Sequence, residues 1–338
     1  MGIIRKEEQP AAIERREVKA EGEKITLQTY AEKVFMPRKS ITIAENTRDL
    51  WQRCLNLRIY PTFGSKPIEE ITSSELYDFI LGLQAEGLAK STVEKYYRLL
   101  RGIFRMAYNT NVITANPMQN VDAPQPRKDE MISEIQAYTA EEIAYIEKCL
   151  ENEPLKWRTV VHLLDDTGCR IGEVCAIEWS RIDWVRQAVV ITCSLCYTPD
   201  KGVFLTTPKN RRKKTVYLSE KTMWLLWKMY MERGKNNSPF VFTKRGSSEP
   251  IHPQSPRKWM EKFGAKYGIE HLHPHKLRHS FASIAITNGA DIASVAEILG
   301  HRDKSVTLRM YTTANAESCR IASSIRRKAV ETAALHIS

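Results

Sequence analysis

Apolar residues recur at helical spacing throughout residues 25–121. Thr72-x-x-Glu75 and Ser91-x-x-Glu94 have the spacing of capping boxes, in which a hydroxyl and a carboxylate satisfy the free backbone N–H groups at a helix start. Each is followed by an apolar stripe, the pattern of one buried helix face. The residues of these stripes are Leu76, Phe79, Ile80 and Leu83, then Val93, Tyr97, Leu100, Ile103, Phe104 and Ala107. The other faces of the second helix carry Lys95, Arg98, Arg101 and Arg105. The pattern predicts a small helical bundle with basic faces.

Two stretches lack this periodicity. Residues 1–24 are highly charged with few large apolar side chains, and we expect a flexible leader there. Residues 122–137 contain two prolines and many charges, which predicts an extended interdomain linker. A second domain should follow over 138–315. Residues 316–338 should form a tail helix whose small apolar strip packs on its own domain or on a neighbouring protomer.

The second domain begins with helical signals. Thr139-x-x-Glu142 is a third capping box, and the apolar pattern over residues 157–164 predicts a helix that ends near Gly168. Near the other end of this domain, a further helix is predicted, with Asp291 as its N-cap and Gly300 as its C-cap.

Between these helices lie short runs rich in β-branched and aromatic residues, over 188–196, 203–207 and 215–218. Turn-forming or charged residues separate them, so we expect a small antiparallel sheet. The fold class is therefore mainly α with a small antiparallel β-sheet: a helical first domain and a mixed α+β second domain.

Charge narrows the class of partner. The chain has 338 residues, a net charge of +11 and a pI of about 9.2, so polyanions such as nucleic acid are favoured partners. No apolar run resembles a signal peptide or a membrane helix, and the seven cysteines are scattered as reduced thiols would be. We expect a cytoplasmic protein.

Candidate chemistry begins with Arg170, which follows a predicted helix end and precedes a new apolar-periodic segment. Its guanidinium should project from a helix start. Glu173, three residues later, can lie on the same side of that helix and brace it. An arbitrary arginine in this position would more often be a surface residue.

A strongly basic turn lies between the second and third β-prone runs. It holds Lys209, Arg211, Arg212, Lys213 and Lys214. A hairpin tip of this charge would suit a phosphate backbone, and a solvated basic loop is compatible with that interpretation.

Two further segments carry histidines and a tyrosine. His275 and Arg278 are spaced i and i+3 at a helix start marked by Pro274, so they can share one face. Gly300-His301 ends the capped helix, and Tyr311 follows ten residues later. In isolation Tyr311 would be a core residue with its hydroxyl satisfied.

A metal site is the competing interpretation of the histidine-rich segment. It is disfavoured because the zinc-protease pattern needs a glutamate directly after the first helical histidine, and Lys276 follows His275. Cys193 and Cys196 do not supply a site, since residues three apart lie on opposite faces of a strand. No metal or cofactor is expected.

Taken in order, these segments resemble the catalytic set of the tyrosine recombinases. TGCRIGE resembles the family box T-G-x-R-x-x-E, HKLR resembles H-x-x-R, and LGH resembles the box that precedes the nucleophilic tyrosine. The resemblance implies a DNA strand-exchange enzyme in which the catalytic residues are Arg170, Lys209, His275, Arg278, His301 and Tyr311, with Glu173 in support. Lys209 would protonate the leaving 5′-oxygen, although the same turn offers four other basic residues.

The resemblance also covers the first domain, which looks like a SAM-like core-binding domain. It implies that two domains clamp double-stranded DNA, that four protomers assemble on paired sites, and that tails are exchanged between protomers. It allows accessory DNA-bending or directionality proteins as partners. The residues that would contact DNA are the basic residues of the turn and of the first domain: Arg211, Arg212, Lys213 and Lys214, then Lys95, Arg98, Arg101 and Arg105.

Two other functions remain open from the sequence. A type IB topoisomerase or a chromosome-resolution enzyme uses similar chemistry, and a noncatalytic DNA-binding relative would be expected to lack Tyr311 or an arginine. We expect the leader to be too short for a folded arm-binding domain. The sequence leaves undetermined the DNA target, the type of mobile element, and whether Tyr311 and the tail act in cis or in trans.

Overall fold

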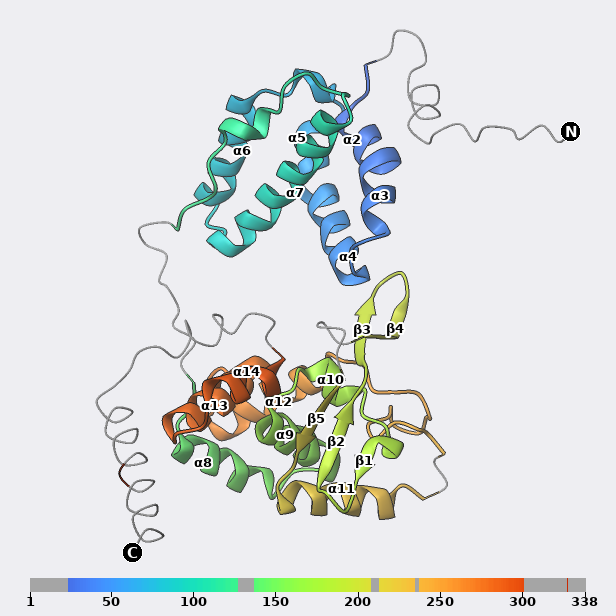
Figure 1. Cartoon of the computed structure of the whole chain (residues 1–338), viewed down its shortest axis with the longest axis vertical. Coiled ribbons are helices and arrows are strands. Elements are labelled where there is room, and N and C mark those ends of the chain that lie inside the picture. Colours follow the sequence, from blue (N-terminus) through green and yellow to red (C-terminus); the bar gives the residue numbers. More distant parts are fainter. Residues whose placement is uncertain (1–23, 127–136, 208–212, 235–236, 301–326, 328–338) are drawn as a thin grey trace, which may run out of the picture. The chain divides into compact units, whose positions relative to one another are not determined.

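The structure is a computed structural model that describes residues 24–126, 137–207, 213–234, 237–300 and Arg327. The chain divides into two compact units, residues 1–132 and 133–338 (Figure 1). The expected leader and tail helix lie outside the described residues, apart from Lys24 and Arg327. None of the described helices has the length and apolar character needed to cross a membrane.

The first unit is entirely helical over its described part, with two of its helices interrupted by a π-helical segment. In chain order the segments are α2 (Leu27–Tyr30), η1 (Ala31–Phe35), α3 (Met36–Ser40), α4 (Glu45–Cys54), η2 (Leu55–Ile59), α5 (Tyr60–Phe63), η3 (Ile68–Glu70), α6 (Ser73–Ala85), α7 (Lys90–Asn109) and η4 (Pro117–Asn120). The predicted bundle is confirmed. Its core contains the two predicted stripes, of which only Phe79 is partly exposed.

The helix starts of this unit confirm one predicted cap and correct another. Thr72 caps α6, and Glu75 completes the box. The Ser91-x-x-Glu94 box is wrong: α7 begins at Lys90 with Ala89 as its N-cap, and no side chain bonds there. The Val93 N–H already donates to the Ala89 carbonyl, so helical bonding starts before Ser91.

The second unit places seven helices, a 3-10 turn and five strands within the described residues. They are α8 (Ala140–Leu150), α9 (Leu155–Thr167), α10 (Ile171–Cys175), η5 (Trp179–Arg181), β1 (Ile182–Asp183), β2 (Ala188–Ile191), β3 (Ser194–Thr198), β4 (Gly202–Thr206), β5 (Lys214–Tyr217), α11 (Glu220–Glu232), α12 (Ser255–Tyr267), α13 (Pro274–Thr287) and α14 (Ile292–Leu299). Helix α9 is central: it contacts α10, α11, α12, α13 and β5.

The strands form two antiparallel sheets where one was predicted. Strands β1, β2 and β5 make a three-stranded sheet with β2 in the middle, while β3 and β4 form a separate hairpin that projects from the unit in Figure 1. The predicted strand over 188–196 breaks at Thr192 and Cys193. Because β4 pairs with β3 and β5 pairs with β2, the basic turn is not a hairpin tip; it joins the two sheets.

Helix caps of this unit follow the sequence signals. Thr139 and Glu142 form the predicted box at α8. Helix α9 ends at Gly168, which adopts the left-handed conformation that glycine tolerates best. Asp291 caps the start of α14 and Gly300 its end, as predicted.

Candidate active site

The turn at Gly168 brings three helices into close contact. Gly168 has φ +56°, and a Cβ there would lie 2.7 Å from Leu299 Cδ2 and 2.8 Å from Phe281 Cδ1. No side chain fits in that space. The end of α9 is therefore packed directly against α13 and α14, and the segment after it carries the first candidate arginine.

Arg170 is the N-cap residue of α10, as the sequence predicts. Its Nη1 donates to Glu173 Oε1 at 3.1 Å, and its backbone N–H donates to Glu173 Oε2 at 3.1 Å. The Glu173 side chain is 2% exposed, whereas that of Arg170 is 27% exposed. A buried carboxylate thus fixes both the backbone and the guanidinium of Arg170, with part of the guanidinium left accessible.

Lys214 reaches the same carboxylate from β5. Its Nζ lies 3.0 Å from Glu173 Oε2 and donates to the Ile298 carbonyl at 3.0 Å, with 15% of the side chain exposed. Burial acts to raise the pKa of Glu173, but Lys214 and Arg170 outweigh it and hold the pKa below its ordinary value. The carboxylate is therefore charged at neutral pH.

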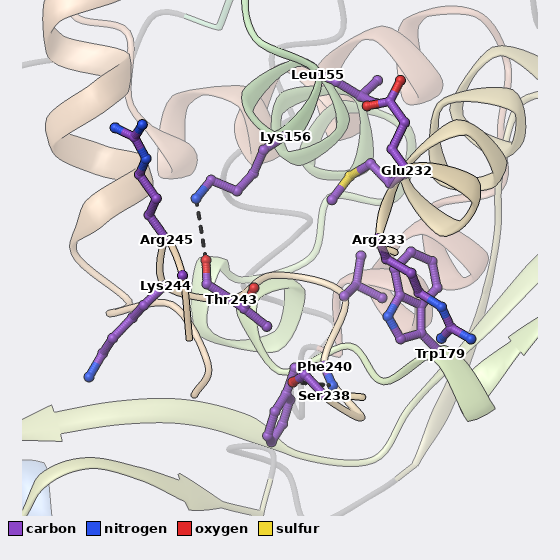
Figure 2. A pocket seen from close by; sticks show the side chains of 13 residues that line it. Leu155, Lys156, Trp179, Glu232, Arg233, Ser238, Phe240, Thr243, Lys244 and Arg245 are labelled. Atoms are coloured by element: carbon purple, nitrogen blue, oxygen red, sulfur yellow. Dashed lines mark hydrogen bonds between the residues drawn. The ribbon is translucent and has the colours of Figure 1, made fainter. Parts of the chain in front are cut away.

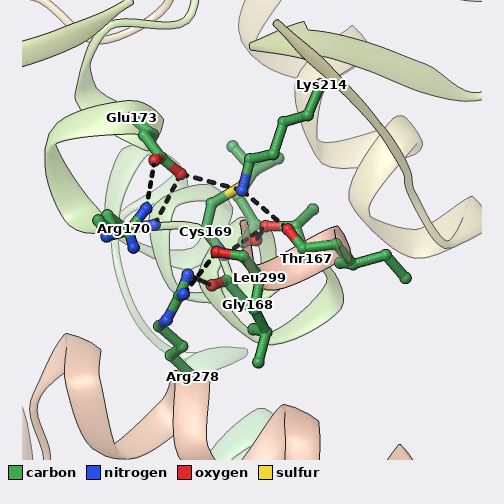
Figure 3. Close-up of polar contacts among 10 residues, drawn as sticks. Thr167, Gly168, Cys169, Arg170, Glu173, Lys214, Arg278 and Leu299 are labelled. Carbon is green, nitrogen blue, oxygen red and sulfur yellow. Dashed lines mark hydrogen bonds and ion pairs between the residues drawn. The ribbon is translucent and has the colours of Figure 1, made fainter. Parts of the chain in front are cut away.

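Arg278 lies on the first turns of α13 and is 6% exposed. Its Nη1 donates to the Gly168 carbonyl at 2.6 Å and its Nη2 to the Leu299 carbonyl at 2.5 Å (Figure 3). The guanidinium therefore ties the ends of α9 and α14 together. Both candidate arginines meet at the turn between Gly168 and Arg170.

His275 lies one turn before Arg278 and is exposed. The N-cap of α13 is His273, whose Nδ1 accepts the Lys276 N–H at 3.2 Å. Burial, followed by nearby charges beginning with His275, holds the pKa of His273 below its ordinary value, so its ring stays neutral and can accept this bond. No group of three or more His, Cys, Asp or Glu within the described ranges is arranged to hold a metal ion.

The net charge of this cluster suits a phosphate. Arg170, Lys214 and Arg278 bring three positive charges, and Glu173 neutralises one. Preorganised cations in a partly buried site stabilise charge that builds up on phosphate oxygens. The arrangement can bind a phosphodiester and stabilise its transition state.

A separate pocket of about 350 Å³ lies at the other end of α9 (Figure 2). Lys156 and Arg245 are among its lining residues, and Lys156 Nζ donates to the Thr243 carbonyl at 3.3 Å. Helix α9 runs from this pocket to Gly168, about 18 Å at 1.5 Å per residue. The pocket is thus remote from the two arginines.

Comparison with known protein families decides the family of the chain. Residues 136–318 match the model of the phage integrase family, and residues 27–123 match that of the phage integrase central domain. The first match alone covers more than half of the chain. The chain belongs to the phage integrase family.

Similar proteins agree with this family. The chain is 29% identical over 256 residues to the tyrosine recombinase XerC of Bacillus licheniformis, covering 74% of this chain and 79% of that protein. The Tn1549 transposon integrase in complex with a circular intermediate DNA has a TM-score of 0.75 at 20% identity, covering 89% of this chain and 98% of that one. A lambda integrase tetramer bound to a Holliday junction has a TM-score of 0.63 at 18% identity. The match covers 88% of this chain and 83% of the lambda integrase chain. This phage integrase family member is a site-specific recombinase of the tyrosine type.

The structure places some of the predicted site residues of this integrase and not others. Arg170, Glu173 and Arg278 meet at the Gly168 turn, and His275 lies one turn from Arg278. The remaining residues of the predicted site, Lys209, Arg211, Arg212, His301 and Tyr311, lie outside the described part of the chain. In the first unit Lys95, Arg98, Arg101 and Arg105 are exposed on α7, where Arg98 pairs with Glu94 at 2.6 Å.

The position of Lys214 differs from the expectation. The sequence suggested an exposed turn residue, but Lys214 lies at the start of β5 and turns inward, while Lys213 is exposed. The signal was present in the alternation of the strand: Lys214 and Val216 share the inner face, whereas Thr215 and Tyr217 are exposed. The carbonyls of Ile298 and Leu299 could not have been found, because backbone acceptors carry no sequence signature.

Proposed function

We propose that this recombinase cleaves and rejoins DNA through a 3′-phosphotyrosyl link to Tyr311, integrating or excising a mobile element. The observation that carries the proposal is the meeting of Arg170 and Arg278 at the Gly168 turn, against the end of α14. His301 follows this helix directly in the chain. The similarity to a transposon integrase supports the mobile-element role.

The proposed chemistry needs each residue type. The phenolic oxygen of Tyr311 forms a bond to phosphorus, and the bond from phosphorus to the 5′-oxygen breaks. Arg170 and Arg278 stabilise the charge on the nonbridging oxygens. His275 and His301 contribute hydrogen bonds and proton transfer, while Lys209 gives a proton to the departing 5′-oxygen. A second 5′-hydroxyl reverses these steps, so the bond energy is conserved without ATP.

The proposed partners are double-stranded DNA and further copies of the chain. The exposed cations on α7 and the exposed Lys213 favour binding to phosphate groups, and the sequence adds Lys209, Arg211 and Arg212 next to Lys213. The similarity to a lambda integrase tetramer supports assembly of four protomers on paired sites. The segment over 316–338 would then link neighbouring protomers.

A nicked suicide substrate tests the proposal. On such a DNA the released fragment diffuses away, so the wild-type protein should accumulate a covalent complex that survives denaturing electrophoresis. Tyr311→Phe should form none, while its DNA affinity stays within about twofold because the hydroxyl supplies few of the contacts. A covalent complex with the Tyr311→Phe variant would show that another residue is the nucleophile.

A further inference from the structure

Lys214 and Lys213 are adjacent in sequence but have different surroundings. Lys213 is exposed before the strand begins, while Lys214 occupies the first inward position of β5 with 15% of its side chain exposed. An ammonium group is normally kept in water unless it is paired. The inward position of Lys214 therefore depends on the two acceptors that it meets.

The first acceptor is the carboxylate that orients Arg170. Lys214 Nζ and the Arg170 N–H both contact Glu173 Oε2, at 3.0 and 3.1 Å, while the Arg170 guanidinium contacts Oε1 at 3.1 Å. One buried carboxylate is thus shared by a lysine on a strand and an arginine at a helix start. If Lys214 is removed, a buried charge loses one of its two cations, and Glu173 is free to shift toward Arg170 or to take up a proton.

The second acceptor is the Ile298 carbonyl in the last turn of α14, at 3.0 Å. The next carbonyl, that of Leu299, accepts from Arg278. Last-turn carbonyls lack partners inside a helix, and cations are favoured at that end. Lys214 and Arg278 therefore hold two consecutive carbonyls at the helix end that leads into Gly300 and His301.

We infer that Lys214 is a positioning residue for strand cleavage, which sets Arg170 through Glu173 and fixes the end of α14. This inference rests on the proposed function. Lys214 contacts neither the DNA backbone nor the departing 5′-oxygen in this assignment. The exposed Lys262 of α12 serves as the comparison, since it has the same chemistry, lies in the same unit and is outside both the candidate site and the proposed DNA contacts.

The test compares Lys214→Met, Lys214→Arg and Lys262→Met on a nicked suicide substrate. At saturating DNA, Lys214→Met should form the covalent complex about 100-fold more slowly, the cost of misplacing a catalytic group by about 1 Å. Its DNA affinity should stay within about twofold. Lys214→Arg should recover most of the rate because it keeps the charge, and Lys262→Met should cleave at the wild-type rate.

A second substrate separates positioning from proton donation. When sulfur replaces the bridging 5′-oxygen, the thiolate leaves without needing a proton, so loss of a proton donor no longer slows cleavage. The defect of Lys214→Met should persist on this DNA. Recovery to the wild-type rate would overturn the inference and make Lys214 the proton donor, and wild-type cleavage of the ordinary substrate by Lys214→Met would remove its role altogether.

Two further measurements keep the inference falsifiable. If circular dichroism shows that Lys214→Met is unfolded, Glu173→Gln replaces it; this variant should also cleave slowly on both substrates with near-normal DNA binding, and normal cleavage would overturn the inference. If the wild-type protein forms no covalent complex that depends on Tyr311, the proposed function fails instead, which distinguishes the two failures.

Discussion

Burial sets the behaviour of the charged residues next to the Gly168 turn. Asp165 and Asp166 are neighbours near the end of α9. Asp166 accepts hydrogen bonds from the backbone and the hydroxyl of Ser219, at 2.9 and 2.7 Å. For Asp165, burial, together with Asp166 and Glu147, raises the pKa to about 7. Two adjacent carboxyls therefore have opposite effects on stability.

Asp165→Asn should stabilise the protein at neutral pH. The folded-state pKa lies above the unfolded value of about 3.8, so the folded state binds more protons between these values and loses stability as pH rises through them. Asparagine removes this loss. The free energy of unfolding should rise by about 1–2 kcal/mol at pH 7.5 and by little near pH 4, as measured by urea denaturation.

Asp166→Asn provides the control for that measurement. It weakens two hydrogen bonds that a carboxylate accepts at the start of α11, so it should lower the free energy of unfolding at pH 7.5 by about 1 kcal/mol. If both substitutions changed the free energy of unfolding equally, the two carboxyls would not have the different surroundings described above.

Two helices of the second unit end in the same way but in different surroundings. Gly168 ends α9 and Gly268 ends α12, both in the left-handed conformation. A Cβ at Gly168 would collide with Leu299 and Phe281, whereas a Cβ at Gly268 has no atom within 4 Å. Comparing the two positions separates the cost of backbone conformation from that of close packing.

Gly168→Ala should therefore be far more damaging than Gly268→Ala. The Gly268 substitution carries only the conformational cost of about 1 kcal/mol, while Gly168 adds overpacking of about 1–3 kcal/mol. Thermal unfolding should show a larger loss of Tm for Gly168→Ala, and only this variant should lose cleavage of the suicide substrate. Similar Tm values for both variants would mean that the helix ends are not tightly packed.

For the molecule as a whole, local patterns were predictable except for the cap at Ser91, and long-range pairings were not. The caps at Thr72, Thr139 and Gly168 could be read from a few neighbouring residues, because they depend on local backbone bonding. The partners of β4 and β5 depend on which strand lies beside each, which no local pattern specifies. The inward position of Lys214 was missed for a different reason, because the alternation that it shares with Val216 was not followed back into the basic turn.

DNA binding by the whole chain should weaken steeply with salt. Neutralising Arg211, Arg212 and Lys213 together should reduce the slope of log affinity against log salt by about 3 units if each contacts one phosphate. Adding Lys214→Met should reduce the slope no further, because Lys214 is engaged by Glu173. Filter binding at several salt concentrations would measure both slopes, and an unchanged slope for the triple variant would exclude these phosphate contacts.

The turn at Gly168 draws on parts of the chain that are made at different times during synthesis. Arg170 is translated first, Lys214 and Arg278 follow, and the carbonyls of Ile298 and Leu299 come last, before Tyr311. Arg170 is held by the nearby Glu173, but Lys214 and Arg278 gain their α14 carbonyl partners only once that helix exists. A chain that ends before α14 would therefore lack the carbonyls that Lys214 and Arg278 bind there, and we expect it to leave DNA uncut.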